Sequence, residues 1–313
     1  MAHVSRRLKF RDLQTILAVA QCGSMAKAAV ALGVTQPAVS DIVAGLENMF
    51  AVKLFDRTPT GVDATVYGQA LLARARAAFD EVQQGIRDIE LLSDPTAGEL
   101  KIGCHASVAA AFLPAIVAGF GRMYPRVAIH FEDVQGPGSE FPGLLERQHD
   151  LVLARIVCPL VDERDLNAEI LFDDPLVVAV DAQGPWARRR KIDLSELVDA
   201  PWILTAPDTW VYRSVAAALY EKGLAMPKIS VVAPSGLLRA NLLQTGPFVT
   251  ALPNSMLRLS KGSRALKALP VSLSIRGYPL AIVTLKNRTL NPLVALFIEH
   301  LREIARLMPA RPG

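Results

Sequence analysis

Apolar residues recur at spacings of three and four over residues 9–32, which predicts helix in that stretch. Gly23 interrupts the pattern, and Ser24 behind it is a suitable N-cap for a second, short helix. Gly33 then supplies a turn, because glycine adopts positive φ at little cost, and Thr35 can cap a third helix. Helix, short glycine-containing turn and helix form the helix-turn-helix layout, although ordinary helical hairpins share it.

The third predicted helix separates an apolar side from a side of small and polar residues. Its apolar side is formed by Val39, Ile42, Val43, Leu46, Met49 and Phe50. On the other side, Gln36 can offer a donor and an acceptor to the edge of an adenine, and Ser40 can bond a base or a phosphate. The N-terminal end of this helix is therefore suited to the major groove of double-stranded DNA.

An ordered run of residues resembles the amino-terminal signature of the LysR-type transcriptional regulators. It comprises Ala28-Ala29, Leu32-Gly33-Val34-Thr35-Gln36-Pro37-Ala38-Val39-Ser40, Ile42, Leu46-Glu47 and Leu54-Phe55-Asp56-Arg57-Thr58. The resemblance implies a winged helix-turn-helix whose groove-facing residues are Thr35, Gln36, Pro37 and Ser40. It also implies that Arg57 and Thr58, at the start of the wing, touch the phosphate backbone.

One position on the predicted DNA-binding face departs from the family pattern. Asp41 stands where family members usually carry a basic residue. A carboxylate there repels phosphate, although it can accept a hydrogen bond from N4 of cytosine. Residues 1–66 also carry only seven Lys and Arg against five Asp and Glu. We therefore expect weaker non-specific DNA binding than is usual for the family and more dependence on dimer avidity.

A long helix is predicted from about residue 67 to residue 92, which contains no proline. Its apolar residues follow a 3-4-3-4-3 spacing: Leu72, Ala75, Phe79, Val82, Ile86 and Ile89. This period is typical of a coiled-coil seam, although a helix packed on its own domain gives the same pattern. The family resemblance implies a linker helix that pairs two chains on a two-fold-related operator, and residues 93–98 are then expected to form a hinge.

From Glu99 onward, strand and helix patterns alternate in two rounds, which predicts an α/β fold of two lobes with mostly parallel sheets. Strands are expected at 100–103, 127–134, 151–157, near 170, and at 175–180, 202–204, 229–232, 249–252 and 280–285. Helices are expected at 109–124, 144–148, 211–222, 237–245 and 292–307. The runs "GELKIG", "FLPAIVAGFGRMYP", "LLERQHDLVLAR" and "PWILTAP" are similar to the regulatory domain of the LysR-type family.

The resemblance implies three structural parts. These are an all-α winged helix-turn-helix at 1–66, a linker helix at 67–94, and a periplasmic-binding-protein-like regulatory domain at 95–313. The first lobe is expected at about 99–172 and 279–313, and the second at about 173–278, with crossovers near 171–176 and 276–281. A small effector between the lobes would then change the spacing of the DNA-binding parts.

Candidate effector-binding residues follow the ends of predicted strands, where ligands bind in such sheets. They are Cys104, His105, Ser107, Gln135, Cys158, Thr205, Trp210 and Phe248. Ser107 is as well suited to capping the following helix as to contacting a ligand, and Trp210 can stack on a ring or belong to the core. Similarity in the later segments to a subgroup that includes galactose-binding-protein regulators favours a sugar or an organic acid as effector.

Composition narrows the class of protein further. The chain has 313 residues, 51% of them hydrophobic, and a net charge of +4, so a basic surface does not dominate it. The stretch 102–121 has no charged residue, but His105, Pro114 and glycines interrupt it, which favours a buried helix over a membrane span. The run Arg188-Arg189-Arg190-Lys191 is typical of a solvated face.

Three separated cysteines and no export signal favour a cytoplasmic protein without a disulfide framework. No pattern typical of a catalytic site, a metal site or a cofactor site stands out, so a non-enzyme is expected. Besides DNA and effector, the expected partners are further copies of the chain, as a dimer or tetramer, and RNA polymerase. Two alternatives stay open: a redox-sensing regulator using Cys104 and Cys158, if their Cα atoms lie within ~7 Å, and a solute-binding protein without a DNA function.

Overall fold

The computed structural model describes residues 8–59, 61–94, 97–134, 140–156, 165–259, 265–271, 273 and 278–307. The chain divides into two compact units, an N-terminal unit (Met1–Arg87) and a C-terminal unit (Asp88–Gly313).

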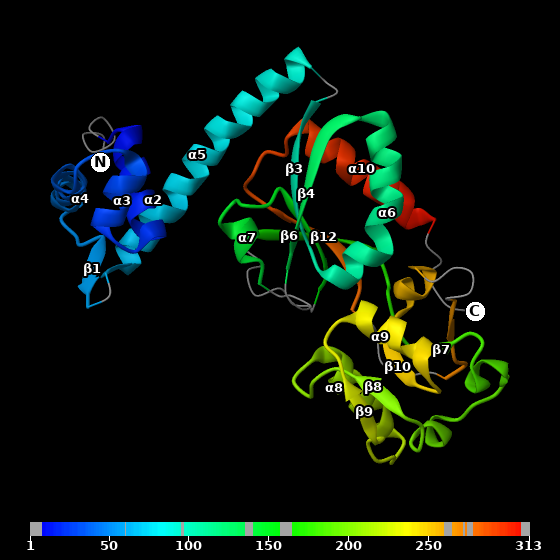
Figure 1. The fold of residues 1–313 in the computed structure, drawn as a ribbon. Helices are drawn as coiled ribbons and strands as arrows, with labels where there is room; N and C mark the ends of the chain where they lie inside the picture. The colour runs from blue at the N-terminus through cyan, green and yellow to red at the C-terminus, as the bar shows by residue number, and fades with distance from the viewer. Residues whose placement is uncertain are drawn as a thin grey trace. The chain divides into compact units, whose positions relative to one another are not determined.

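The N-terminal unit is a winged helix-turn-helix, as the family resemblance implied, but it is not all-α, because its wing is a pair of strands (Figure 1). Its helices are α2 (Phe10–Cys22), α3 (Met25–Leu32) and α4 (Gln36–Phe50), and its wing is the antiparallel pair β1 (Phe55–Thr58) and β2 (Gly61–Ala64). Gly23 (φ 62°) and Gly33 (φ 64°) adopt the left-handed conformation at the two turns between helices. The core is formed by Leu13, Ile16, Val19, Ala28, Ala29, Val39, Val43, Leu46, Leu54 and Phe55.

The spacing of Phe10, Leu13, Leu17 and Ala20 predicts one apolar stripe for α2, but the buried stripe differs from it. Leu13, Ile16 and Val19 are buried, whereas Phe10 is 47% exposed. The ring of Phe10 instead packs against that of Phe79, with centroids 4.3 Å apart.

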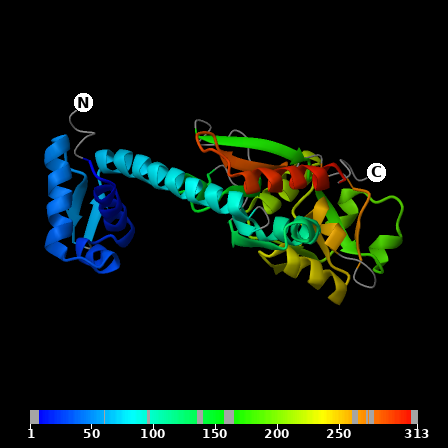
Figure 2. The ribbon, with the colours of Figure 1, turned by 90° about the horizontal axis from the view of Figure 1, so that it is seen from above.

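Helix α5 (Val66–Ser93) is one continuous helix, drawn in cyan in Figure 2. Its apolar repeat changes surroundings along its length. Leu72 and Ala75 are buried in the core of the N-terminal unit, and Phe79 packs against that core. Farther along, Val82, Ile86 and Ile89 are 50%, 52% and 66% exposed. The first half of the repeat therefore packs on its own unit, and the second half is exposed.

The first lobe of the C-terminal unit is built on a five-stranded sheet. Its order is β4 (Arg126–Asp133), β3 (Ala97–Cys104), β5 (Leu151–Arg155), β12 (Leu280–Leu285) and β6 (Leu166–Phe172). Helices α6 (Ala106–Met123) and α10 (Pro292–Arg306) cover one face, and the short α7 (Pro142–Leu145) packs on the other (Figure 1).

Among the described residues, α6 alone is a single helix long and apolar enough to cross a membrane by length and composition. One side of it, including Phe112, Ile116 and Phe120, is buried in the core of the first lobe. This matches the expectation of a buried helix in that stretch.

The second lobe is built on a second five-stranded sheet. Its order is β11 (Leu266–Ala268), β7 (Leu176–Asp181), β10 (Val249–Pro253), β8 (Trp202–Leu204) and β9 (Ile229–Val232). Its helices are α8 (Trp210–Glu221) and α9 (Gly236–Leu242), and its short helical turns are η1 (Pro185–Arg188), η2 (Leu194–Leu197), η3 (Leu243–Thr245) and η4 (Asn254–Leu259).

The sheets were expected to be mostly parallel. Most strands of each sheet do run in the same direction, but every pair that includes β7 or β12 is antiparallel. β3 runs parallel to β4 and β5, and β8 runs parallel to β9 and β10. β12 is antiparallel to both its neighbours, and so is β7. These are the strands by which the chain enters one lobe from the other, so each runs against the rest of its sheet. The carboxyl ends of the remaining strands therefore face the junction between the lobes.

Candidate functional site

The predicted DNA-binding face of α4 is exposed at its N-terminal end. Thr35, Gln36, Pro37 and Asp41 are exposed, and Ser40 is half-buried. Thr35 is the N-cap residue of α4, although its side chain makes no capping hydrogen bond. Gln36 Nε2 donates to Ser40 Oγ at 2.9 Å, and Ser40 Oγ lies 3.4 Å from Met25 Sδ as a donor. The amide of Gln36 is thus held over the first turn of α4.

The wing is held against the turn between α2 and α3. The N–H of Val62 donates to the carbonyl of Gly23 at 2.9 Å. Gly61 has φ 151°, and a Cβ there would lie 2.1 Å from the same carbonyl oxygen, so only glycine fits this approach. The predicted phosphate-contacting residues lie on β1, where Arg57 is exposed and Thr58 is half-buried.

Glu47 positions the start of the wing, a role that sequence reasoning missed. Its side chain is buried on α4 and accepts hydrogen bonds from the backbone N–H groups of Leu54 (3.0 Å) and Phe55 (3.4 Å) and from Lys53. Burial acts to raise the pKa of Glu47, but the hydrogen bonds from Lys53, Leu54 and Phe55 lower it below its usual value. The sequence signal that could have indicated this role is an acidic residue next to the apolar positions of α4.

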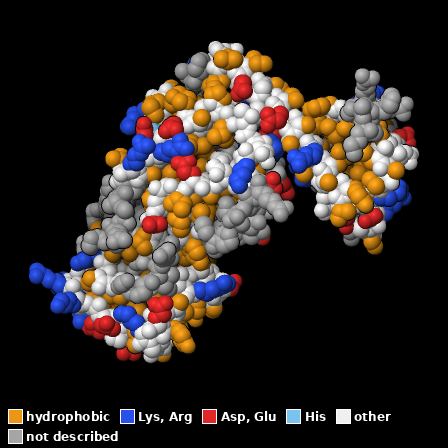
Figure 3. Space-filling model, turned by 180° about the vertical axis from the view of Figure 1, so that it is seen from behind, with side chains coloured by type: hydrophobic (Ala, Val, Ile, Leu, Met, Phe, Trp, Pro, Cys, Tyr) orange, Lys and Arg blue, Asp and Glu red, His pale blue; other side chains and the backbone are white. Residues whose placement is uncertain are grey.

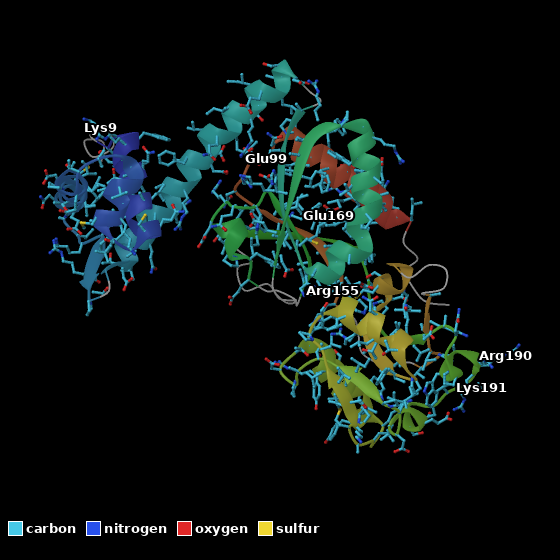
Figure 4. All side chains as sticks on the ribbon, viewed as in Figure 1. Lys9, Glu99, Arg155, Glu169, Arg190 and Lys191 are labelled. Atoms are coloured by element: carbon cyan, nitrogen blue, oxygen red, sulfur yellow. The ribbon has the colours of Figure 1, made fainter. Side chains whose placement is uncertain are left out.

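A buried polar cluster lies where the two lobes meet, and Figure 4 labels Arg155 at this junction. Arg155, the last residue of β5, is 4% exposed. Its Nη2 donates to the carboxylate of Asp174, and its Nη1 donates to Ser107 Oγ at 3.0 Å. Asp174 also accepts from Ser255, through the backbone N–H at 2.8 Å and the hydroxyl at 2.7 Å. The cluster joins both lobes, because Ser107 belongs to α6 and Ser255 to η4.

His105, and not Ser107, caps α6. His105 Nδ1 accepts from the backbone N–H of Ser107 at 3.2 Å and lies 2.8 Å from its hydroxyl. Because Nδ1 accepts, the ring is neutral and carries its proton on Nε2. Burial lowers the pKa of His105, and the charges of Arg155 and Arg239 lower it further, against the opposing effect of Asp133.

The thiol of Cys104 is poorly suited to redox chemistry. Cys104 is 2% exposed, and burial raises its pKa to about 12. A protonated thiol is a weak nucleophile and is oxidised slowly. Cys158 and Gln135 lie outside the described residues.

The other predicted effector residues lie in the second lobe. Thr205 is buried, and its hydroxyl bonds that of Thr209, the N-cap of α8. Trp210 is half-buried and packs edge-on against Tyr278, with centroids 5.2 Å apart. Phe248 is half-buried against the core around Leu243. The structure thus joins His105 and Ser107 to Arg155, whereas no contact joins them to these three side chains among the described residues.

A pocket of about 430 Å³ lies elsewhere on the first lobe, between α10 and the strands β6 and β12. Its charged lining consists of Glu169, Glu299 and Arg302, which are linked by ion pairs. None of the predicted effector residues lines it. Within the described residues, no cluster of His, Cys, Asp and Glu is arranged to hold a metal ion.

The basic run of the second lobe is exposed. Figure 4 labels Arg190 and Lys191 at the outer edge of this lobe, and Figure 3 shows Lys and Arg side chains projecting from that edge. Arg189 pairs with Glu196 and lies 5.7 Å from the ring of Trp186. The arrangement is that of a solvated face.

Comparison with protein families agrees with both parts of the fold. Residues 10–69 match the family model "Bacterial regulatory helix-turn-helix protein, lysR family". Residues 93–306 match the model "LysR substrate binding domain".

Individual proteins are similar over nearly the whole chain. The HTH-type transcriptional regulator TdcA of Escherichia coli (strain K12) is 25% identical over 295 residues, covering 94% of this chain and 93% of the relative. The structure of a full-length OxyR from Pseudomonas aeruginosa has a TM-score of 0.64 at 23% identity, covering 97% of this chain and 96% of the other. That of full-length CbnR complexed with its target DNA has a TM-score of 0.52 at 21% identity, covering 95% and 100%.

These similarities, which span the helix-turn-helix and both lobes, are to transcriptional regulators and not to enzymes. Because the substrate-binding-domain model alone matches more than half of the 313 residues, the chain belongs to the LysR family and is a DNA-binding transcriptional regulator with an effector-binding domain.

Proposed function

We propose that this regulator reads a two-fold-related operator through the N-terminal end of α4. The observation that carries the proposal is the hydrogen bond between the exposed Gln36 and the half-buried Ser40 on one face of α4, while the opposite face is in the core. Thr35, Pro37 and Asp41 extend this face. A helix held in this way can present amide and hydroxyl groups to base edges.

In this proposal, the wing contacts the phosphate backbone of the DNA. Arg57 on β1 is exposed, and its charge suits a phosphate oxygen. Thr58 follows it as a hydroxyl donor. Since the wing is tied to the α2–α3 turn through Val62 and Gly23, its position relative to α4 is set by the fold of the N-terminal unit.

Dimerisation through α5 rests on the exposed half of its apolar repeat. Val82, Ile86 and Ile89 are available to a second chain, whereas Leu72 is 3% exposed within its own unit and Phe79 packs against the same core. A seam of this kind would place two copies of α4 on successive half-sites of the operator. The proposal also includes further association to a tetramer and contact with RNA polymerase. It places the action of the protein in the cytoplasm.

The proposed effector site is the junction between the two lobes. Its candidate residues are Cys104, His105 and Ser107 in the first lobe and Thr205, Trp210 and Phe248 in the second. Gln135 and Cys158 are candidates from the sequence alone, since they lie outside the described residues. Arg155, Asp174 and Ser255 join the lobes at the same place. A sugar or an organic acid that binds one arrangement of the lobes better than another would shift their equilibrium, and with it DNA binding.

The test is binding of the full-length protein to a labelled duplex from the promoter region beside its own gene, followed by fluorescence anisotropy. Gln36→Ala is expected to weaken binding about tenfold or more, because one base contact is lost. The matched control is Gln69→Ala, since Gln69 is exposed on α5, and it is expected to bind as the unaltered protein does. Equal affinity of Gln36→Ala and Gln69→Ala would contradict the proposal.

A further inference from the structure

Helix α9 carries a buried positive charge without an acidic partner among the described residues. Arg239 is 3% exposed. Its Nη1 donates to two neutral acceptors, the carbonyls of Ala233 (2.9 Å) and Pro234 (3.0 Å), and its Nε is buried without a partner. A buried guanidinium normally has a carboxylate beside it, because an isolated charge is costly to remove from water.

The other two arginines of the C-terminal unit that are buried in the described part of the chain follow that rule. Arg155 pairs with Asp174, and Arg288 pairs with Asp150 at 3.1 Å. Arg239 therefore stands apart from them in the same unit. Burial lowers its pKa to about 10, so it still carries its charge at neutral pH.

Helix α9 reaches the junction between the lobes, because Ala240 packs in a cluster with Met256, the neighbour of Ser255, and Ala111 of α6 packs against that cluster. The charges of Arg155 and Arg239 both lower the pKa of His105 at the start of α6. Asp133, the acidic residue that opposes them there, is exposed and already accepts the N–H of Ala106 at 3.0 Å. Asp174 is occupied by Arg155 and Ser255. Among the described residues at this junction, the buried charges of Arg155, Arg239 and Asp174 therefore sum to one positive charge.

A carboxylate compensates this excess positive charge better than an uncharged molecule does. Its two oxygens match the fork of N–H groups on a guanidinium, and its charge offsets that of the cation. The neutral ring of His105 adds a donor at Nε2. Hydroxyl groups of a neutral sugar can accept hydrogen bonds here but leave the charge uncompensated.

We propose that the effector of the inter-lobe site is a carboxylate whose oxygens pair with Arg239. The assignment rests on the proposed function, since it names the ligand class of the site proposed there. It also supplies a driving force for the response. Without a ligand, Arg239 is buried as a cation that is unpaired within the described part of the chain, whereas a carboxylate bound at the junction would pair with it. The anion thus favours the arrangement of the lobes in which its oxygens reach Arg239.

The experiment measures the thermal unfolding midpoint of the full-length protein with about 10 mM of each probe at matched ionic strength. The probes are acetate, pyruvate, succinate, citrate and benzoate, their uncharged counterparts acetamide and benzamide, glucose and galactose, and inorganic phosphate. At least one carboxylate is expected to raise the midpoint by about 2 °C or more, with no rise from its amide or from the sugars. An equal or larger rise with the amides, the sugars or phosphate, or no rise with any carboxylate, would overturn the proposal.

Variants at Arg239 tie the effect to this residue. Arg239→Gln keeps donors for the two carbonyls but loses the charge, and it is expected to lose at least about tenfold in affinity for the active carboxylate. Arg190→Met, a loss of charge at an exposed position of the same lobe, is the control and is expected to keep the affinity. If Arg239→Gln fails to fold, Arg239→Lys keeps the charge without the fork and is expected to bind several-fold more weakly. Unchanged affinity in the folded Arg239 variant would overturn the proposal.

Operator binding measured on the same samples separates this proposal from the proposed function. A carboxylate effect that depends on Arg239, in a protein that binds no operator, would support the ligand assignment and contradict the proposed function. Operator binding without any carboxylate effect would support the proposed function and contradict the ligand assignment.

Discussion

The guanidinium of Arg155 and the carboxylate of Asp174 form a buried ion pair that joins the end of β5 to the segment crossing between the lobes. Side chains on both sides complete it, with Ser107 contributed by α6 and Ser255 by η4. This ion pair therefore contributes to holding the two lobes together.

Asp174→Asn is expected to destabilise the C-terminal unit strongly. The change leaves Arg155 buried without a negative partner, which typically costs about 3–5 kcal/mol. Urea unfolding of the full-length protein followed by circular dichroism measures the loss. Asp173→Asn is the matched control, because Asp173 is the exposed neighbour of Asp174. A difference between the two variants of less than about 0.5 kcal/mol would show that the pair contributes little.

Glu47→Gln is expected to destabilise the N-terminal unit. Leu54 and Phe55 both donate to Oε1 of Glu47, whereas Lys53 donates to Oε2. Glutamine keeps the first acceptor, but its NH2 group replaces the oxygen that accepts from Lys53, and it lacks the charge that strengthens all three bonds, at a cost of about 1–2 kcal/mol. Because the folded pKa of Glu47 lies below its usual value, its contribution is present above that usual value and is lost as the pH falls through the folded one.

The measurement is urea unfolding of both proteins at neutral and acidic pH. The gap between the unaltered protein and Glu47→Gln should narrow as the pH falls. Glu81→Gln, at an exposed position of α5, is expected to show no gap. A gap for Glu47→Gln that is constant with pH would contradict the role of its charge.

His105→Asn is expected to reduce the sensitivity of the C-terminal unit to mild acid. The folded pKa of His105 is lowered by burial, Arg155 and Arg239, against Asp133. The unfolded chain therefore binds a proton more readily, so the contribution of His105 is present above about pH 6.5 and falls as the pH drops toward the folded value. Asparagine keeps a capping acceptor but does not titrate.

Unfolding midpoints at about pH 7 and about pH 5 measure this effect. His130→Asn, at an exposed position of β4, is the control and is expected to keep the acid sensitivity of the unaltered protein. Acid sensitivity that is the same in His105→Asn and His130→Asn would refute the assignment.

Asp41→Arg is expected to raise general DNA affinity. The change removes a carboxylate from the exposed face of α4 and adds a cation that can neutralise a phosphate. The slope of log K against log salt concentration should steepen by about 0.9 for one added phosphate contact. Asn48→Arg is the comparison, because it adds the same charge about two turns farther along α4, beyond the N-terminal end proposed to enter the groove. Non-operator duplexes at several salt concentrations measure the slope, and an unchanged affinity across them would count against the idea.

Local sequence patterns predicted those helices and strands in which an apolar run is clearly bounded by turn or polar residues. The strands Trp202–Leu204, Ile229–Val232 and Leu280–Leu285 lie at the predicted positions because each is an apolar run between turn or polar residues. Strand Leu266–Ala268 was missed, since it is three residues long and has a lysine at its centre. Serine was the residue expected to cap α6, yet the folded context selects His105.

The buried charges at the lobe junction were not predictable in the same way. Asp174 lies 19 residues from Arg155, and Ser255 lies 100 residues from it. Their contact exists only because two sheets bring the carboxyl ends of their strands together. The one local signal was an arginine that ends the apolar strand Leu151–Arg155. The lone charge of Arg239 likewise becomes evident only when the partners around it are known.

Selection of bound duplexes from a random-sequence pool by the full-length protein tests the central claim most directly. The account predicts enrichment of an inverted repeat whose half-sites lie about 10 base pairs, or a multiple of that spacing, apart. It also predicts that Gln36→Ala does not enrich this repeat. No enriched sequence, a single unrepeated motif, or the same repeat selected equally well by Gln36→Ala would contradict it.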